Sequence, residues 1–117
     1  MSKVTIYHNP RCSKSRQTKG ILDEKGIDYN VVEYLKDTPD ADELTEILAK
    51  LKKRPLEVIR TGESRFSELG LSTSDNRADQ EWIQLMVANP ILIERPIVIN
   101  DEKAALGRPV ENVVNIL

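Results

Sequence analysis

The first 35 residues change from a strand-like pattern to a helical pattern and back again. The β-type run Val4-Thr5-Ile6-Tyr7 ends at the turn residues Asn9-Pro10, which predicts a first strand. Residues 13–25 are predicted to form a helix that Gly26 closes. Residues 29–35, YNVVEYL, are predicted to form a second strand, so the chain begins β-α-β.

Helical spacing dominates the middle of the chain. Asp40 and Glu43 are typical of a helix start, and the apolar residues that follow lie at i, i+3, i+4 and i+7: Leu44, Ile47, Leu48 and Leu51. A short helix is predicted over residues 55–60 and a single turn, closed by Gly70, over residues 66–71. A longer helix around Trp82 must end before Pro90. These segments form a helical block.

The last part of the chain predicts a β-hairpin and a helix. Residues 97–100 and 103–106 are predicted strands around the turn Asp101-Glu102, and Pro109 fits the first turn of a closing helix. The inward stripe of that helix is predicted to be Val110, Val113, Val114 and Leu117. The whole order predicts an α/β, thioredoxin-like fold with a mixed four-stranded sheet. We expect one domain over residues 1–117, with a core of about 1–36 and 91–117 and a helical insertion of about 38–90.

Composition restricts the class of protein. A chain of 117 residues fits one domain, and 39% hydrophobic residues suffice for one core. The net charge of -2 gives no general basic field, so neither nucleic acid nor an acidic membrane is expected as a partner. One cysteine cannot form an internal disulfide, which indicates a reducing compartment or an external thiol partner.

The expected location and oligomeric state depend on four features that the sequence does not show: a signal peptide, a membrane span, heptads and apolar patches. The opening MSKVTIYHNP has no apolar run of the kind that signal peptides need. Charged residues and a proline interrupt the longest apolar stretch, so no membrane span is expected. We therefore expect a cytoplasmic protein, and the lack of heptads or apolar patches predicts a monomer.

The stretch HNPRCSKSR, residues 8–16, contains the only cysteine and the only histidine. Cys12 would lie at the start of a helix, where N–H groups and the helix dipole lower cysteine pKa values from ~8.5 to ~3.5–7.5. The same N–H groups bind oxyanions, so the stretch predicts a thiolate that attacks an oxyanion or a disulfide. The alternative is an ordinary helix start with an incidental cysteine.

The neighbours of Cys12 support the first interpretation. Three cations add positive charge, and the hydroxyls of Ser13 and Ser15 could donate to the sulfur. His8 either tunes Cys12 electrostatically or ends the strand with a backbone hydrogen bond, and the sequence leaves both open.

Spacing excludes several other sites. A tyrosine-phosphatase loop needs arginine where this chain has Thr18, and a dithiol loop needs a second cysteine where it has Ser15. One histidine and one cysteine are too few for a zinc site, so we expect no metal and no tightly bound cofactor. Cys12 therefore needs an outside thiol to complete a reaction cycle.

Two X-Arg-Pro steps bear on the site: Glu94-Arg95-Pro96 and Gly107-Arg108-Pro109. In a thioredoxin-like layout the residues before the hairpin face the start of the first helix, and the proline there is commonly cis. Arg95 would then lie beside Cys12.

Further arginines could reach the same pocket, where a guanidinium can bind two oxygens of an anion. Arg108 and Arg60 are candidates, but spacing does not separate Arg60 from Arg54 or Arg65. Each could also be an ordinary surface residue of a chain with 17 cations.

Three stretches together, HNPRCSKSR, PILIERPIVI and GRPVENVVNIL, resemble the signature blocks of the glutaredoxin-coupled arsenate reductase family. The resemblance extends over essentially the whole chain, and it is strongest to a branch of uncharacterised bacterial paralogues. It implies a thioredoxin-like fold with a helical insertion. It also implies an enzyme that reduces arsenate to arsenite with glutathione as cosubstrate and glutaredoxin as partner.

The resemblance also implies roles for individual residues. Cys12 matches the nucleophile that forms the arsenate adduct. The residues that match the oxyanion-binding arginines are Arg60, Arg95 and Arg108. His8 and Ser15 match the residues that lower the cysteine pKa, and Pro96 matches the cis-proline.

One departure from the family bears on the substrate. Ser13-Lys14 follows the cysteine where arsenate-reducing members often carry Gly-Thr. Two alternatives to an arsenate reductase remain: a non-enzymatic redox-sensing or regulatory protein on the same fold, and a monothiol disulfide reductase. The arsenate reductase is favoured because only it uses all three arginines.

Overall fold

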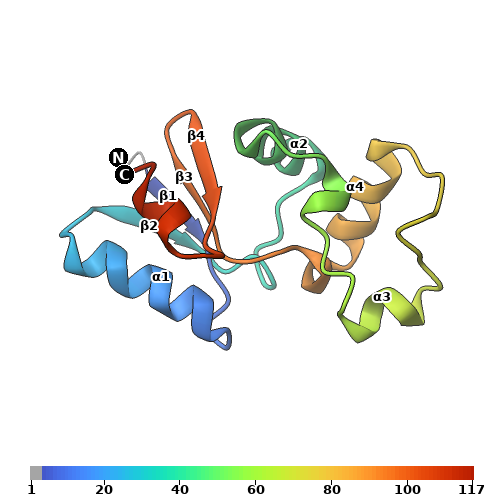
Figure 1. Ribbon diagram of the computed structural model, residues 1–117, viewed down its shortest axis with the longest axis horizontal. Helices are drawn as coiled ribbons and strands as arrows, with labels where there is room; N and C mark the ends of the chain where they lie inside the picture. Colours follow the sequence, from blue (N-terminus) through green and yellow to red (C-terminus); the bar gives the residue numbers. More distant parts are fainter. Residues whose placement is uncertain (1–3) are drawn as a thin grey trace. The chain divides into compact units, whose positions relative to one another are not determined.

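The structure is a computed structural model that describes residues 4–117 (Figure 1). The first elements are β1 (Val4–Tyr7), α1 (Ser13–Glu24) and β2 (Tyr29–Val32), and the last are β3 (Ile97–Asn100), β4 (Lys103–Leu106) and α5 (Glu111–Val114). Between them lie α2 (Ala41–Leu51), η1 (Pro55–Glu57), α3 (Ser64–Glu68), α4 (Asp79–Ala88) and η2 (Pro90–Leu92). No helix among residues 4–117 is both long and apolar enough to cross a bilayer.

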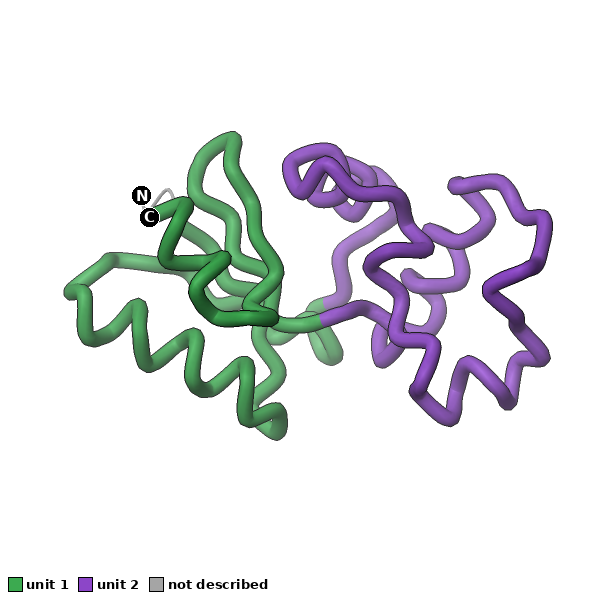
Figure 2. Tube along the Cα trace, viewed as in Figure 1, with its two compact units in different colours: residues 1–37, 95–117 green, residues 38–94 purple. Residues whose placement is uncertain are grey.

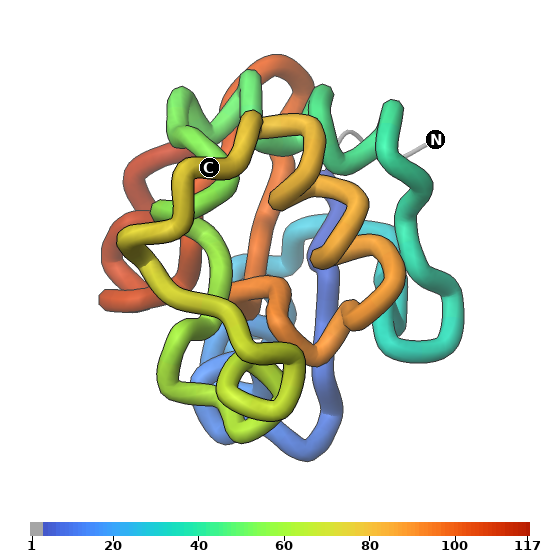
Figure 3. The backbone as a smooth tube through the Cα atoms, turned by 90° about the vertical axis from the view of Figure 1, so that its right-hand side faces the viewer, coloured from blue at the N-terminus to red at the C-terminus, as the bar shows by residue number. Residues whose placement is uncertain are grey.

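The four strands form one mixed sheet in the order β2-β1-β3-β4. Strand β1 is parallel to β2 and antiparallel to β3, and β3 is antiparallel to β4. Ile6 stands opposite Val98, and Val98 stands opposite Ala105, so an apolar row crosses three strands. Figure 3 shows β1 (blue) beside the β3–β4 hairpin (orange). The predicted thioredoxin-like fold class is confirmed.

Helices α1 and α5 cover one face of this sheet. Leu22 of α1 and Val113 of α5 are both 0% exposed, and they belong to the same core cluster as the row through Ile6 and Val98. Side chains on one face recur every 3.6 residues in a helix and every 2 residues in a strand. Leu22 lies on the face of α1 that is turned to the sheet, and the buried strand residues lie on the face of the sheet that is turned to α1. This packing holds α1 on the sheet. Because α1 follows β1 in the chain, its first turn comes directly after the carboxyl end of β1.

The chain divides into two compact units (Figure 2). The sheet unit comprises Met1–Asp37 and Arg95–Leu117, and the helical unit comprises Thr38–Glu94. The boundaries predicted from the sequence are at about residues 36, 38, 90 and 91. That the two units act as one domain stays a prediction.

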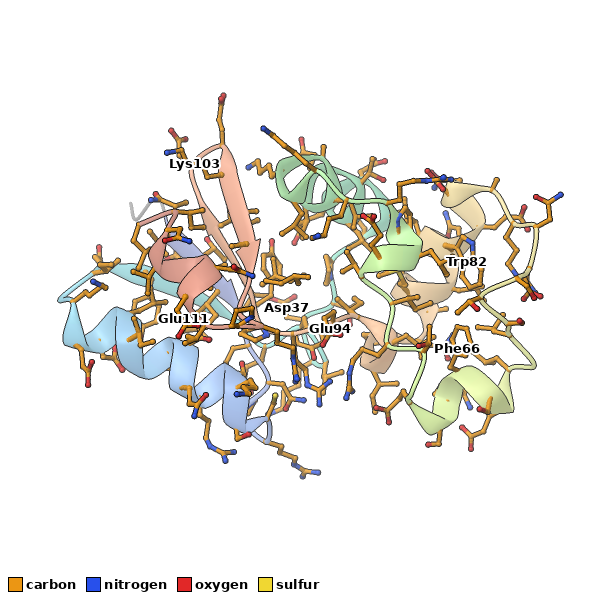
Figure 4. The ribbon with its side chains drawn as sticks, viewed as in Figure 1. Asp37, Phe66, Trp82, Glu94, Lys103 and Glu111 are labelled. Atoms are coloured by element: carbon orange, nitrogen blue, oxygen red, sulfur yellow. The ribbon has the colours of Figure 1, made fainter. Side chains whose placement is uncertain are left out.

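The helical unit has an apolar core of its own. Helix α2 begins after Asp40, whose carboxylate accepts the N–H of Glu43 at 2.8 Å, and it packs against α4. The predicted apolar face of α2 is buried: Leu44, Ile47, Leu48 and Leu51. The rings of Phe66 and Trp82 stack with their centroids 6.4 Å apart and an angle of 7° between their planes (Figure 4). A separate core explains how the segment forms its own compact unit.

The structure corrects the second predicted strand. Strand β2 ends at Val32, three residues earlier than predicted, because the chain turns at Glu33. The main-chain oxygen of Glu33 accepts the N–H groups of Lys36 and Asp37 at 2.9 and 2.8 Å. Tyr34, which continues the apolar pattern, is buried inside this turn at 1% exposure.

Two predicted helices also differ. The helix predicted over residues 55–60 is the 3₁₀ turn Pro55–Glu57, because Ile59 pairs instead with Ile93 in an isolated antiparallel bridge. The final helix begins at Glu111, after a cis Arg108–Pro109 peptide, and its predicted stripe was partly wrong. Val113 is buried, but Val114 and Leu117 are 37% and 36% exposed.

Candidate active site

Cys12 is the residue immediately before the first turn of α1. A tight turn follows β1, with the N–H of Cys12 donating to the carbonyl of Asn9 at 3.0 Å. The carbonyl of Cys12 accepts the first helical bond, from Arg16 at 3.0 Å. The side chain is 7% exposed, and the main-chain N–H groups of Ser15 and Lys14 lie close enough to lower the pKa of its thiol. The thiol therefore lies at the positive end of a 12-residue helix.

The surroundings of Cys12 lower its pKa below the ordinary thiol value. Burial acts in the opposite direction, because it disfavours the charged thiolate. The Ser15 N–H, the Arg95 charge, the Lys14 N–H and the Arg108 charge together outweigh burial. Lys14 acts here through its main chain, and its side chain is exposed. The site therefore favours a nucleophilic thiolate.

Two arginines of the sheet unit act on the Cys12 thiol, and one of them contacts its sulfur. Nη2 of Arg108 is 3.6 Å from Sγ of Cys12, and Nε of Arg108 donates to the carbonyl oxygen of Arg95 at 2.8 Å. Nε and Nη1 of Arg95 are shielded from solvent. Arg108 therefore contacts Cys12, and Arg95 lies close enough for its charge to lower the pKa of the thiol.

A close junction holds these arginines in place. The Arg95–Pro96 peptide is cis, as expected, and the carbonyl of Pro96 accepts the N–H of Gly107 at 2.9 Å. A Cβ atom on Gly107 would lie 2.6 Å from Cγ of Pro96 and 2.7 Å from Oγ1 of Thr18. Real Cβ atoms essentially never approach so closely. Only glycine at position 107 therefore lets the segment before Arg108 pass so close to Pro96 and α1.

His8 and Ser15 form a buried pair beside the turn. Nδ1 of His8 lies 2.6 Å from Oγ of Ser15, and Oγ also accepts the N–H of Asn9 at 3.0 Å. The Ser15 hydroxyl therefore faces His8 and Asn9, and it is the main-chain N–H of Ser15 that lowers the pKa of the Cys12 thiol. The N–H of His8 donates to the carbonyl of Val32 at 2.8 Å. The backbone hydrogen bond considered for His8 is present.

Burial lowers the pKa of His8, and the charge of Lys19 lowers it further. Glu33 opposes these effects, and Arg16 adds a smaller lowering. A neutral ring can accept the Ser15 hydroxyl proton at Nδ1, so we assign its own proton to Nε2. In this form His8 is linked to the turn through the Ser15 hydroxyl.

Arg60 belongs to the helical unit. Its Nη1 lies 2.6 Å from Oε2 of Glu63, and its Nε lies 3.9 Å from Oε1 of Glu94. The two rivals from the sequence are also ion-paired, Arg54 with Asp79 and Arg65 with Glu68. Arg60 is the least exposed of the three, with 23% of its side chain accessible. Its role toward Cys12 stays a prediction.

Three residues that shape the site were not predicted to belong to it. Asn9 closes the turn through its main chain and also accepts the N–H of Arg11 with its side chain at 3.0 Å. Thr18 and Gly107 form the close junction with Pro96. The Asn-Pro dipeptide signals a turn, but no sequence pattern shows that Thr18 and Gly107 meet.

The described residues offer no obvious metal centre. Among residues 4–117 there is no group of three or more His, Cys, Asp or Glu side chains that could hold a metal ion.

Comparison with known proteins identifies the family. A sequence model of the ArsC family matches residues 7–116, which include every predicted site residue. The chain belongs to the ArsC family. It is 45% identical over 116 residues to the uncharacterized protein YfgD of Escherichia coli K12, covering 98% of this chain and 97% of that protein. The family predicted from the three sequence stretches is confirmed.

Other ArsC relatives carry the name arsenate reductase. The protein of that name from Neisseria meningitidis serogroup A is 41% identical over 118 residues, covering all of both chains. The solved structure of arsenate reductase from Vibrio cholerae superposes with a TM-score of 0.92 at 39% identity, covering 97% of each chain. This ArsC chain therefore spans the full fold of those relatives.

Proposed function

We propose that this ArsC-family chain is an enzyme that reduces arsenate to arsenite through a covalent adduct on Cys12. The observation that carries the proposal is the Arg108 guanidinium, with Nη2 3.6 Å from a buried thiol of lowered pKa. The relatives named arsenate reductase in Neisseria and Vibrio support the choice of substrate.

In the first step the Cys12 thiolate attacks the arsenic atom of arsenate. A sulfur–arsenic bond forms, an arsenic–oxygen bond breaks, and the departing oxygen takes protons from solvent and leaves as water. Arg95 and Arg108 stabilise the charge on the arsenate oxygens, because guanidinium groups donate two parallel hydrogen bonds to such anions. The N–H groups at the start of α1 can hold a further oxygen.

In the second step glutathione supplies the electrons. Its thiolate attacks the sulfur of Cys12, so a sulfur–sulfur bond forms and the sulfur–arsenic bond breaks. The electron pair of that bond stays on arsenic, which passes from the pentavalent to the trivalent state and leaves as arsenite. The two sulfurs are oxidised to the Cys12–glutathione disulfide.

In the third step glutaredoxin restores the enzyme. A glutaredoxin thiolate attacks the glutathione sulfur of the mixed disulfide, and Cys12 leaves as a thiolate. The lowered pKa of Cys12 makes it a good leaving group in this exchange. The chain has one cysteine and cannot resolve the disulfide internally, so the cycle needs the reduced thiols of a cytoplasmic compartment.

The remaining predicted residues complete the proposal. Arg60 is the third arginine to bind the oxyanion. Pro96 sets the path of the chain at Arg95, and His8 with Ser15 fixes the turn that carries Cys12. Ser13 and Lys14 are exposed, so their replacement of Gly-Thr leaves the main-chain N–H groups at the sulfur unchanged.

The test is arsenate-dependent oxidation of NADPH by the purified protein, coupled through glutathione, glutaredoxin and glutathione reductase. Turnover is expected for the wild type and not for Cys12→Ser, which should still bind arsenate. An active Cys12→Ser protein would disprove the covalent mechanism.

The same assay separates the two alternative functions. A redox sensor would become reversibly glutathionylated at Cys12 without any arsenate turnover. A monothiol reductase would reduce a glutathione mixed disulfide at a useful rate in the absence of arsenate. Either result, together with no arsenate reduction, would replace the proposed function.

A further inference from the structure

A pocket of about 240 Å³ opens in the sheet unit where β1 and β2 end. Residues 8–11 form one wall, and Glu33, Leu35 and Lys36 from the turn after β2 form the other. Leu35 is a large apolar side chain that is 41% exposed here. None of the proposed steps so far uses this pocket.

The pocket adjoins the turn that carries Cys12. Asn9, Pro10 and Arg11 form both its wall and the chain from β1 to Cys12, and the N–H of Cys12 closes that turn on Asn9 at 3.0 Å. The Cα atoms at the two ends of such a turn lie less than about 7 Å apart. An extended peptide covers about 3.3–3.6 Å per residue. A peptide ligand with one end in the pocket would therefore need about two further residues of its own, in an extended conformation, to reach Cys12.

The charges of the pocket suit a particular kind of ligand. Two cations, Arg11 and Lys36, and one anion, Glu33, line it. Nζ of Lys36 and Oε1 of Glu33 are 4.0 Å apart with 82% and 44% of their side chains exposed, so their own ion pair is weak. Glutathione carries two carboxylates, one ammonium group and a central thiol. Its charges complement those of the pocket in number and sign.

We propose that this pocket binds one end of glutathione and presents its thiol to the Cys12 adduct. The inference rests on the proposed function, because it locates the cosubstrate of that reaction. A pocket of about 240 Å³ is slightly smaller than the ~300 Å³ at which small-molecule sites begin, so it accepts part of the tripeptide rather than the whole. The remainder extends along the turn toward Cys12.

The pocket and the arginines belong to different segments around Cys12. The pocket contacts the turn from the side of residues 8–11, whereas Arg108 contacts the Cys12 sulfur from the segment after β4. Arsenate held by the arginines and glutathione held by the pocket therefore use different protein groups. The glutathione thiolate attacks the Cys12 sulfur, the sulfur–arsenic bond breaks, and arsenic takes its electron pair.

The first test measures binding without turnover. S-methylglutathione cannot form a disulfide, so it can be titrated against the ¹⁵N-labelled wild-type protein. The expected amide shift changes lie at residues 8–11 and 33–36, and Lys36→Glu should weaken them. Changes confined to other residues, such as 95–97 and 107–108, would overturn the proposal. Because arsenate is absent, this result does not depend on the reductase activity.

The second test is kinetic and uses matched charge reversals. Lys36→Glu reverses a cation in the pocket wall, and Lys25→Glu reverses an exposed cation at the far end of α1. Lys36→Glu should raise the KM for glutathione by about threefold to fivefold, as expected for an exposed ion pair, with kcat and the KM for arsenate unchanged. Lys25→Glu should leave all three constants as in the wild type.

The outcomes separate this proposal from the proposed function. Equal KM values for glutathione in Lys36→Glu and the wild type would overturn the glutathione pocket while arsenate reduction stands. No arsenate reduction in the wild type would overturn the proposed function, and the titration would still decide whether the pocket binds glutathione.

Discussion

Nε of Arg108 donates to the main-chain oxygen of Arg95 at 2.8 Å. This bond uses one edge of the guanidinium for positioning and leaves Nη2 directed at the Cys12 sulfur, 3.6 Å away. The two arginines that lower the pKa of Cys12 are therefore linked, and displacing one disturbs the other. A lysine could supply the charge but not both contacts, because its ammonium group is a single point donor.

This arrangement predicts different effects for two variants of Arg108. Arg108→Ala should raise the pKa of Cys12 and lower kcat/KM for arsenate by about 10²-fold, as for loss of one oxyanion donor. Arg108→Lys should keep part of the pKa effect but lose most of the rate. The pH dependence of Cys12 alkylation and the coupled assay measure the two effects.

Arg54→Ala is the matched control for Arg108, because Arg54 pairs with Asp79 in the helical unit. It should leave both the alkylation profile and the arsenate kinetics unchanged. An Arg108→Ala protein with a wild-type alkylation profile would contradict the electrostatic role of Arg108.

The Ser15 hydroxyl makes a second prediction. It bonds to His8 and to the N–H of Asn9, whereas the main-chain N–H of residue 15, which lowers the pKa of Cys12, survives substitution. Ser15→Ala should therefore reduce the free energy of unfolding by about 1–3 kcal/mol, because it leaves buried polar groups without this partner. The pKa of Cys12 should change little.

Urea unfolding and the pH profile of alkylation separate these effects. Ser13→Ala is the control, because Ser13 is an exposed serine in the same turn of α1. If Ser15→Ala shifts the alkylation profile strongly without loss of stability, the hydroxyl acts on Cys12 directly and the assignment of its partners is wrong.

Much of the fold was predictable because local signals agreed with the tertiary structure. Val4–Tyr7 and Ile97–Asn100 carry β-type sequences, and both of these strands and Lys103–Leu106 have the predicted bounds. Gly26 has a φ of 65°, in the left-handed region that a glycine after a helix commonly adopts. The prediction of the second strand was wrong at its end, because an apolar residue there belongs to a turn. Tyr34 continues a strand-like pattern but is buried in the turn at Glu33.

The site was predictable only in part. The position of Cys12 could be predicted from the neighbouring sequence alone, because a strand pattern precedes it and a helix start follows it. Arg95 and Arg108 were placed by the expected thioredoxin-like layout, which brings together segments far apart in the sequence. The contact between Thr18 and Gly107 depends on side-chain packing across that layout. Spacing along the chain does not encode such contacts.

The close junction at Gly107 makes a third prediction. Gly107→Ala would force a Cβ to within 2.6 Å of Pro96 and 2.7 Å of Thr18, so the segment must shift and carry Arg108 with it. Overpacking of this kind costs about 1–3 kcal/mol in stability. We also expect a lower kcat for arsenate and a raised pKa of Cys12, measured by the coupled assay and by alkylation.

Gly20→Ala provides the control for Gly107. Gly20 is an exposed residue within α1, and a Cβ there would meet nothing within 4 Å. Alanine at this position should stabilise the protein by about 0.5–1 kcal/mol and leave the kinetics unchanged. Equal stability and activity in Gly107→Ala and the wild type would show that the junction does not position Arg108.

The last prediction concerns how the free energy of unfolding depends on pH, and it follows from the lowered pKa of Cys12. Between the folded pKa and the unfolded value of about 8.5, the unfolded chain keeps the thiol proton and the folded chain does not. The free energy of unfolding should therefore rise with pH in that window. This contribution is fully present above about pH 8.5 and is lost as the pH falls through the folded pKa.

Urea unfolding of the wild type and of Cys12→Ser, under reducing conditions from pH 5 to pH 10, tests this sign. Other titrating groups act alike in both proteins, so the difference between the two curves reports Cys12 alone. That difference should grow in favour of the wild type as the pH rises through the folded pKa and become constant above about 8.5. Parallel curves across the range would mean that folding leaves the thiol pKa unchanged, and the helix start and the two arginines would then not activate Cys12.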